Sequence, residues 1–289
     1  MNRKAPLTVI VPAFNAASFL AVTLQSLQQQ TTPPDQVILV DDGSTDDTAA
    51  IAERHGVTVI RQQQMGPGAA RNRGLAAATT EFVAFLDADD WYVPDKLERC
   101  VKTLTELNAA CIGTDAWVVR NDRVEGRKNQ SRVVPTALTM ELLLQDNPVV
   151  CSTVVARRAA VLAAGGFDEH PDMVATEDFD LWLRMAGREP IAYLPQPLTF
   201  YRVHAGSLSA NSRFLRGIDR IMAKVAQEHV GEAHFQNLVR ARRADVRLDL
   251  AWDLIGAGRK QEARELINEA RGMASSWKAL RMRLRMLLR

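Results

Sequence analysis

The chain has 289 residues, of which 47% are hydrophobic and 24% are charged. This composition is typical of a soluble globular protein and excludes the disordered and fibrous classes, and the length allows one sizeable α/β core with roughly 80 residues left for an appended part. The net charge is only +2, yet residues 1–200 carry −7 and residues 201–289 carry +9. The acidic part suits a cation-binding site, while the basic part suits either an anionic partner or simply soluble helices.

Short apolar segments alternate with helical patterns through the first 110 residues. Continuous runs of Val, Ile, Leu and Phe predict strands buried on both faces at Leu7–Val11, Gln36–Val40, Val57–Ile60 and Phe82–Leu86. Helices are predicted between them at Ala16–Gln30, Asp46–His55 and Gly68–Ala78. This alternation predicts an α/β fold with a mostly parallel, doubly wound sheet and right-handed crossovers. Because ligands bind such sheets at the carboxyl ends of the strands, the residues after each strand are the candidate site.

After residue 110 the pattern is less regular. Strands are predicted at Ile112–Val119 and Val149–Val155, and helices at Thr139–Leu144 and Glu177–Ala186. The charged segment 120–135 is predicted to be a mobile loop. Further loops are expected around the prolines Pro190, Pro195 and Pro197.

From about residue 211 onward the pattern is helical only, which predicts one domain over residues 1–210 and a helical extension over residues 211–289. Apolar residues on both sides of Gly256–Gly258 predict an antiparallel helical hairpin that resembles one tetratricopeptide unit, whereas arrays of such repeats generally need three or more. Residues 277–289 combine basic and apolar faces, a pattern typical of an amphipathic helix on an anionic membrane. A helix packed on its own domain explains this pattern equally well. Few aromatic residues lie between the arginines, so nucleic acid is not an expected partner.

The cysteines and the first residues of the chain indicate where in the cell the protein is expected. Cys100, Cys111 and Cys151 are odd in number and lack C-x-x-C spacing, which supports neither a disulfide framework nor a zinc site and is typical of buried thiols in a reducing compartment. The basic start and short apolar run mimic a signal peptide, but Pro12 ends the run and no small-residue cleavage site follows. No stretch reaches the roughly 18–20 apolar residues that cross a bilayer. A cytoplasmic location, or a peripheral one on the inner face of the membrane, is therefore predicted.

Acidic residues gather directly after the predicted strands. The segments that follow the first, second and fourth strands are Pro12-Ala13-Phe14-Asn15, Asp41-Asp42-Gly43-Ser44 and Asp87-Ala88-Asp89-Asp90. Parallel strands would bring at least four of these carboxylates into one crevice, where like charges repel unless a cation or hydrogen-bond donors compensate. A hard divalent ion, held by one or two carboxylates and by phosphate oxygens, is the usual solution. Any one of these acids alone would be ordinary, because Asp often opens turns.

Arg71 lies at a predicted helix start near the same sheet edge, within the glycine-rich segment Gly66–Gly74. In this place an arginine can pair with a diphosphate or with the acidic cluster, and a surface helix arginine is the alternative. The segment lacks the third glycine of a dinucleotide fingerprint and does not follow the first strand, and the sequence holds no P-loop.

These segments together resemble the family 2 glycosyltransferases of the GT-A fold. The resemblance rests on the order and spacing of residues 9–15, 40–46, 66–75 and 85–90, and it spans roughly residues 5–205. It implies a nucleotide-sugar donor, usually a UDP-sugar, and a Mn²⁺ or Mg²⁺ ion. The residues placed at the nucleotide are Pro12, Phe14, Asn15, Asp41, Asp42, Arg71, Asp87 and Ala88, and the resemblance makes Asp89 a metal ligand.

The segment Glu177–Asp180 resembles the acceptor side of the same family, whose catalytic base maps to Asp178, with Glu177 as an orienting neighbour. A positioned carboxylate can take the proton of an acceptor hydroxyl as the bond to the anomeric carbon forms, while a metal stabilises charge on the departing diphosphate. One base and direct displacement imply inversion. His204 matches a family histidine that completes the metal shell, and a histidine held only by hydrogen bonds is the equal alternative.

The expected activity is therefore transfer of a single sugar to a glycan or lipid-linked acceptor in cell-surface glycan synthesis. The family also includes processive polysaccharide synthases, which carry a Gln-x-x-Arg-Trp motif. Because this motif is absent here, addition of a single sugar is expected rather than polymerisation. A sugar-nucleotide pyrophosphorylase is a weaker interpretation, because its glycine-rich, lysine-bearing loop does not follow the first strand. The remaining alternative is a non-catalytic nucleotide-sugar-binding or scaffold protein whose helical tail recruits partners, against which Asp87, Asp89 and Asp178 argue.

Overall fold

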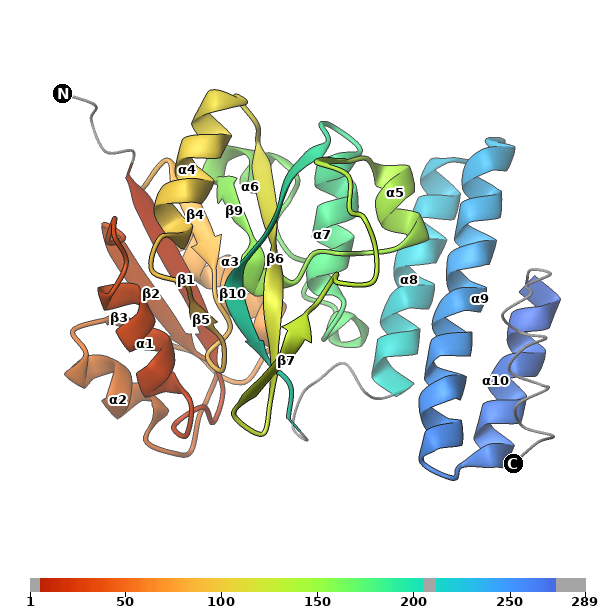
Figure 1. The fold of residues 1–289 in the computed structure, drawn as a ribbon, viewed down its shortest axis with the longest axis horizontal. Coiled ribbons are helices and arrows are strands. Elements are labelled where there is room, and N and C mark those ends of the chain that lie inside the picture. The colour runs from red at the N-terminus through yellow and green to blue at the C-terminus, as the bar shows by residue number, and fades with distance from the viewer. Residues whose placement is uncertain (1–5, 205–211, 274–289) are drawn as a thin grey trace.

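The computed structural model describes residues 6–204 and 212–273, and within them a ten-stranded sheet is covered by helices (Figure 1). The strands are β1 Leu7–Ala13, β2 Gln36–Asp41, β3 Thr58–Arg61, β4 Phe82–Phe85, β5 Trp91–Tyr92, β6 Cys111–Arg120, β7 Arg123–Arg127, β8 Ala137–Leu138, β9 Val155–Arg157 and β10 Ile191–Arg202. The helices are α1 Leu20–Gln28, α2 Thr48–Arg54, α3 Pro67–Ala77, α4 Lys96–Glu106, α5 Met140–Gln145, α6 Arg158–Ala163, α7 Glu177–Ala186, α8 Ser212–Glu228, α9 Ala233–Gly256 and α10 Lys260–Met273, with 3₁₀ turns η1 Cys151–Thr153 and η2 Pro171–Met173. The α/β class predicted from the sequence is confirmed.

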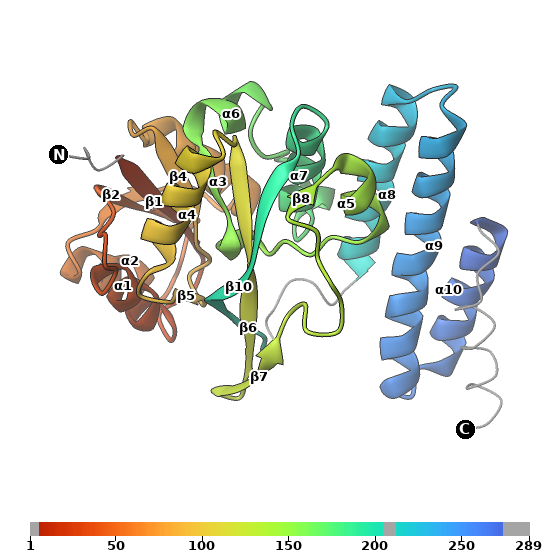
Figure 2. The same ribbon diagram turned by 45° about the horizontal axis from the view of Figure 1, so that its top comes forward.

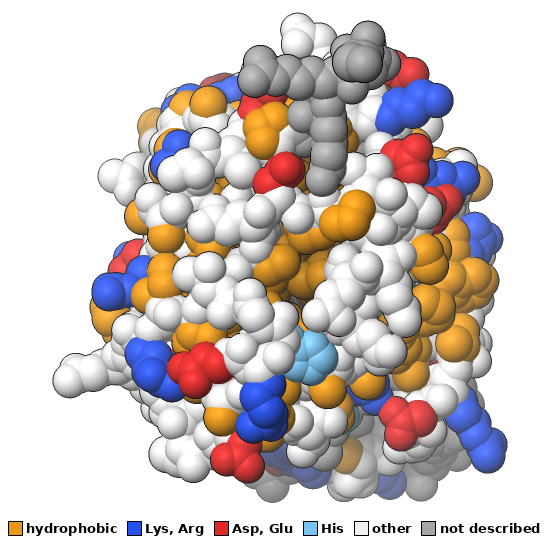
Figure 3. All heavy atoms as spheres, turned by 90° about the vertical axis from the view of Figure 1, so that its left-hand side faces the viewer, with side chains coloured by type: hydrophobic (Ala, Val, Ile, Leu, Met, Phe, Trp, Pro, Cys, Tyr) orange, Lys and Arg blue, Asp and Glu red, His pale blue; other side chains and the backbone are white. Residues whose placement is uncertain are grey.

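The first half of the sheet is parallel, in the order β3-β2-β1-β4. Strand β1 is buried along its whole length and pairs with β2 on one side and β4 on the other, so the carboxyl ends of these three strands lie at one edge. Strand β3 does not show the predicted burial on both faces: Thr58 and Arg61 are exposed because β3 is the edge strand. On the face shown in Figure 3, basic and acidic side chains of the described residues are interspersed.

The second half of the sheet is mixed. Strand β9 runs antiparallel between β4 and β6, while β10 is parallel to β6. The strand predicted over Val149–Val155 is wrong for most of its length, because residues 151–153 form the turn η1 and β9 begins only at Val155. The hydroxyl of Thr153 donates to the Val150 carbonyl at 2.7 Å, a local bond that competes with extended pairing.

Two further expectations are corrected in this half. Pro195 and Pro197 do not mark a loop but lie inside β10, where the pairing with β6 shifts register around Pro197. The segment 120–135 is not a free loop, because β7 forms a hairpin with β6 and the side chain of Asn129 is buried. The Asn129 amide donates to Asp115 at 3.1 Å and to the Tyr193 hydroxyl at 2.8 Å, which fixes the segment to the sheet.

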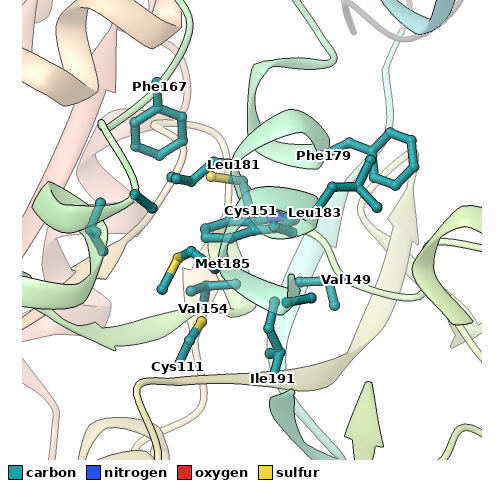
Figure 4. Close-up of a cluster of buried hydrophobic side chains, with 14 of the residues drawn as sticks. Cys111, Val149, Cys151, Val154, Phe167, Phe179, Leu181, Leu183, Met185 and Ile191 are labelled. Atoms are coloured by element: carbon teal, nitrogen blue, oxygen red, sulfur yellow. The ribbon is translucent and has the colours of Figure 1, made fainter. Parts of the chain in front are cut away.

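Helices cover both faces of the sheet (Figure 2). On one face α1, α2 and α4 pack with Val9 and Val11 of β1, and on the other α3, α6 and α7 pack with Ile10. This division follows from the two-residue period of a strand. Figure 4 shows part of the second cluster, in which the free cysteines Cys111 and Cys151 lie among apolar side chains. All three cysteines are buried and free, as predicted.

The helical part continues from this core. Helix α8 contributes Ile218, Ile221 and Met222 to the same apolar cluster as α7. Helices α9 and α10 form the predicted antiparallel hairpin around their own small core. Because α8 shares the core of residues 1–204, the division at residue 210 stays a prediction, and residues 277–289 lie outside the described part. No helix among the described residues is long and apolar enough to cross a membrane.

Candidate active site

A cavity of about 780 Å³ opens at the carboxyl ends of β1, β2 and β4. Its walls include every site residue predicted from the sequence except Asp41, namely Pro12, Phe14, Asn15, Asp42, Arg71, Asp87, Ala88, Asp89, Glu177, Asp178 and His204. These residues come from six parts of the chain: residues 12–15, 42, 71, 87–89, 177–178 and 204. Of the acidic residues that follow the strands, three line the cavity, namely Asp42, Asp87 and Asp89, one fewer than the four predicted, and Glu177 and Asp178 join them.

The structure corrects the prediction for Asp41. This residue is buried at the end of β2, and its Oδ1 accepts a hydrogen bond from the Ser44 amide at 3.0 Å. The next residue, Asp42, reaches the cavity because neighbouring residues in extended chain point to opposite sides. Its two carboxylate oxygens accept hydrogen bonds from the amides of Met65 and Gly66, both at 2.8 Å. Asp42 thus ties the end of β2 to the start of α3.

Arg71 pairs with the acidic cluster. Pro67 starts α3 after Gly66, whose φ of 96° suits glycine. Arg71 follows one turn later, with its side chain almost fully buried. The guanidinium donates from Nη1 to Oε1 of Glu177 at 2.5 Å and from Nη2 to Oδ1 of Asp87 at 2.6 Å. One cation therefore joins α3, the segment after β4 and the start of α7, so the structure excludes the alternative of a surface arginine.

Asp178 lies in the first turn of α7, half-buried at the cavity wall. Burial of the carboxyl raises its pKa to about 7, and the neighbouring charge of Glu177 acts in the same direction, while Arg71 opposes both. A carboxylate with this pKa exchanges its proton near neutral pH, which suits general acid–base chemistry. The Phe179 amide donates to Asp178 Oδ1 at 2.7 Å and orients the group.

Asp89 and His204 are in contact with each other in the cavity lining. The distance from Nε2 of His204 to Oδ2 of Asp89 is 3.0 Å. Burial, followed by the charge of Asp87, raises the pKa of Asp89. No group of three or more ligating side chains is arranged to hold a metal within residues 6–204 and 212–273. One carboxylate oxygen and one imidazole nitrogen nevertheless fit a divalent ion whose other ligands are phosphate oxygens.

Asp90, the last acid of the segment after β4, is fully buried away from the cavity lining. Its Oδ1 accepts a hydrogen bond from the Arg202 amide at 2.8 Å. Burial raises its pKa well above the usual range, and the neighbouring charges of Asp89 and Asp87 act in the same direction.

Arg202 lines the cavity and was missed by the sequence analysis. Its guanidinium lies over the rings of Phe19 and Trp91, at 5.0 and 4.8 Å from the ring centroids, and it pairs with Asp122 at the tip of the β6–β7 hairpin. The segment that contains it was singled out only for His204, two residues on. The position of Arg202, a charged residue two places before the candidate metal ligand His204, could have indicated its place in the site.

The family comparison decides the class of this site. The model of glycosyl transferase family 2 matches residues 8–166. The chain belongs to glycosyl transferase family 2. Membership confirms the predicted enzyme class, a glycosyltransferase, and excludes the pyrophosphorylase interpretation.

Named relatives share this class. The amylovoran biosynthesis glycosyltransferase AmsE of Erwinia amylovora is 33% identical over 58% of this chain and 61% of its own length. TuaG of Bacillus subtilis, named for teichuronic acid biosynthesis, is 30% identical over 73% of this chain and 84% of its own length. The UDP-Glc:alpha-D-GlcNAc-diphosphoundecaprenol beta-1,3-glucosyltransferase WfgD of Escherichia coli is 29% identical over 50% of this chain and 55% of its own. The matches to AmsE and WfgD thus span less than two thirds of those proteins.

Two solved structures share the fold. TarS 1–349 of S. aureus in complex with UDP-GlcNAc has 23% sequence identity and a TM-score of 0.65, covering 82% of this chain and 71% of that one. The mannosyltransferase PcManGT of Pyrobaculum calidifontis, in complex with GDP-Man and Mn²⁺, has 19% identity and a TM-score of 0.65, covering 99% of this chain and 81% of that one. These likenesses confirm the predicted glycosyltransferase fold.

Proposed function

We propose that this glycosyltransferase is an inverting, metal-dependent enzyme that transfers a single sugar from a UDP-sugar to an acceptor hydroxyl in cell-surface glycan synthesis. The observation that carries the proposal is the placement of Asp178, with a pKa raised to about 7, in the same cavity as the Arg71–Asp87 pair and the Asp89–His204 pair. A base and a diphosphate-binding region in one cavity are what direct displacement needs.

The donor side of the cavity is assigned to the nucleotide. Phe14 is 45% exposed on the cavity wall and offers an aromatic surface to a base. Pro12, Asn15 and Ala88 line the same wall, and Asp42 holds the segment that closes it. A uridine nucleotide is favoured because TarS, of the same fold, is solved with UDP-GlcNAc and WfgD is named for UDP-Glc.

In the proposed reaction the acceptor oxygen attacks the anomeric carbon of the donor, and the bond from that carbon to the diphosphate oxygen breaks. The carboxylate of Asp178 accepts the proton of the acceptor hydroxyl, and the nucleoside diphosphate leaves with the bonding electron pair. Glu177 orients the site through Arg71, which in turn fixes Asp87. A single displacement on the face opposite the diphosphate inverts the anomeric configuration.

Asp89 and His204 would hold Mn²⁺ or Mg²⁺ together with the diphosphate. When bound, the ion stabilises negative charge on the departing diphosphate. The solved complex of PcManGT with GDP-Man and Mn²⁺ supports this assignment by likeness of fold.

The proposed acceptor is a lipid-linked glycan, because WfgD is named for a diphosphoundecaprenol-linked sugar. Such an acceptor would place the enzyme in the cytoplasm, at the inner face of the membrane. Contact through the basic residues 277–289 is part of this proposal and concerns residues outside the described part.

The test is a thermal-shift screen of nucleotide sugars with and without Mn²⁺, followed by an assay of UDP release from the best donor. We expect a UDP-sugar to stabilise the protein only with the metal, and UDP release to require Asp178. The matched variant Asp178→Asn should bind donor like the wild type but turn over at least ~10²-fold more slowly. Equal turnover of this variant would refute Asp178 as the base, and equal binding with EDTA would refute the metal requirement.

A further inference from the structure

Helix α8 lies directly behind the cavity wall that carries Asp178. This wall is defined as residues 171–178 and consists of η2, the short link after it and the start of α7. Pro171, Val174 and Ala175 line the cavity beside Asp178. Both ribbon views place α8 next to α7 (Figures 1 and 2). Met173 of the wall is fully buried in the same apolar cluster as Ile218 and Met222 of α8. The wall is thus packed between the substrate cavity and the helical part of the chain.

The packing of α8 on the wall is close at backbone level. A Cβ atom added to Gly217 would lie 2.1 Å from Oγ1 of Thr176 and 2.8 Å from the carbonyl oxygen of Asp172. The neighbouring Arg216 donates to Oδ1 of Asp172 at 3.0 Å. Ala175 within the wall has a φ of 75°, a conformation that L residues avoid and that needs support from the surrounding structure. Helix α8 supplies such support from behind.

Lys224 of α8 joins two segments of the acceptor side. Its ammonium donates to Oδ2 of Asp168 at 2.6 Å and to Oδ1 of Asp180 at 2.8 Å. Asp180 is buried in the first turn of α7, two residues after Asp178, and its other oxygen binds Arg184. The loop that contains Asp168 contacts α3, because a Cβ on Gly68 would lie 3.1 Å from the Asp168 carbonyl oxygen. Lys224 therefore links the start of α7 to the loop in front of it, together with Arg184, which binds Asp180 and the Gly166 carbonyl oxygen.

We propose that Lys224 is a positioning residue that holds the first turn of α7, and with it Asp178, against the acceptor hydroxyl, so that the helical part of the chain is needed for turnover. This proposal rests on the proposed function of Asp178. The donor-side residues Phe14, Asp42 and Asp89 follow β1, β2 and β4, strands that Figure 1 shows away from α8. On the donor side, the buried pairs of Arg71 with Glu177 and Asp87 do not involve Lys224 and stay in place when the lysine is replaced. Lys224 therefore acts on the chemical step rather than on donor binding.

The position of Asp178 has a measurable signature. The charged and titratable groups that face it are Glu177 on its own helix, Arg71 from α3, Asp87 after β4 and Cys151 of η1. If the first turn of α7 loosens, water reaches the carboxyl and its pKa falls towards the usual value. The pH at which turnover is half-maximal then falls as well.

The experiment compares Lys224→Gln with the wild type, using Lys102→Gln as the matched control because Lys102 is an exposed lysine of α4. We expect kcat of Lys224→Gln to fall about tenfold to a hundredfold, as for a small misplacement of a catalytic group, with its half-maximal pH shifted to lower values. The KM for the donor should stay within about twofold, because the donor site is untouched. Lys224→Arg, which keeps the charge, should recover most of kcat, and Lys102→Gln should match the wild type.

Unchanged kcat and pH profile in a folded Lys224→Gln protein would overturn the proposal. A parallel loss of kcat and donor affinity would also overturn it, because it would show general loosening. If Lys224→Gln does not fold, Asp168→Asn, which removes one partner of the lysine, is measured in the same way against the same expectations. Lack of UDP release by the wild type would refute the proposed function and this inference together, whereas an active wild type with an unaltered Lys224→Gln refutes this inference alone.

Discussion

Replacing Asp178 by asparagine should stabilise the protein while it slows turnover at least ~10²-fold. The carboxyl is held in a place that disfavours its charge, through burial and the neighbouring Glu177. Asparagine has nearly the same shape and no charge to desolvate. Asp178, which the proposed mechanism needs, therefore lowers the stability of the folded state.

The size of this gain follows from the pKa. Folding raises the pKa of Asp178 from 3.8 to about 7, and each tenfold change in proton affinity is about 1.4 kcal/mol. Ionised Asp178 therefore destabilises the folded state by up to roughly 4 kcal/mol above pH 7. Below pH 4 the group is protonated in both the folded and unfolded states, so no penalty remains. The advantage of Asp178→Asn should grow between pH 4 and pH 7 and then stay constant.

The assay is thermal or urea unfolding of both proteins at pH 4.5 and pH 8, where the difference in Tm should widen by about 2–4 °C per kcal/mol for a domain of this size. Asp180→Asn is the matched control in the same helix turn. Asp180 pairs with Arg184 and Lys224, so its replacement should lower Tm. Equal unfolding curves for Asp178→Asn and wild type at both pH values would refute the prediction that ionised Asp178 destabilises the folded state.

Other expectations concern the base, the metal, the core and the tail. The kcat of the wild type should rise with pH and reach half its plateau at a pH of about 7, because only ionised Asp178 accepts the acceptor proton, and a flat profile from pH 5 to 8 would contradict this. Asp89→Ala should abolish Mn²⁺-dependent UDP binding in calorimetry, and undiminished affinity would exclude a metal role. Gly74→Ala should destabilise by about 1–3 kcal/mol in urea unfolding, since its Cβ would lie 2.5 Å from Cγ2 of Ile10, whereas Gly256→Ala, with open space around it, should be neutral or stabilising. Deletion of residues 277–289 should reduce sedimentation with anionic vesicles, and unchanged sedimentation would leave the tail a packing helix.

The sequence determined that β1, β2 and β4 run parallel, that acidic residues follow them and that Arg71 lies near a helix start. These features are local, because the hydrophobic period, the strand length and the turn residues depend on residues that are close together in the sequence. The start and end of α7 were predicted correctly for the same reason. The prediction of a strand over residues 149–155 failed because a side-chain hydrogen bond of Thr153 favoured a turn.

Only the tertiary structure decided which acids reach the cavity and what they contact. Asp41 and Asp42 are equivalent in sequence, and the pleat of the chain places Asp42 alone in the lining. The pairing of Arg71 with Glu177 joins residues 106 positions apart, and the raised pKa of Asp178 arises from burial between segments that meet only in the fold. The contact of Lys224 with α7 is likewise invisible in the sequence. Desolvation and ion pairing depend on distances in space, so residue types and spacing predict which groups are present, and folding sets their charge and partners.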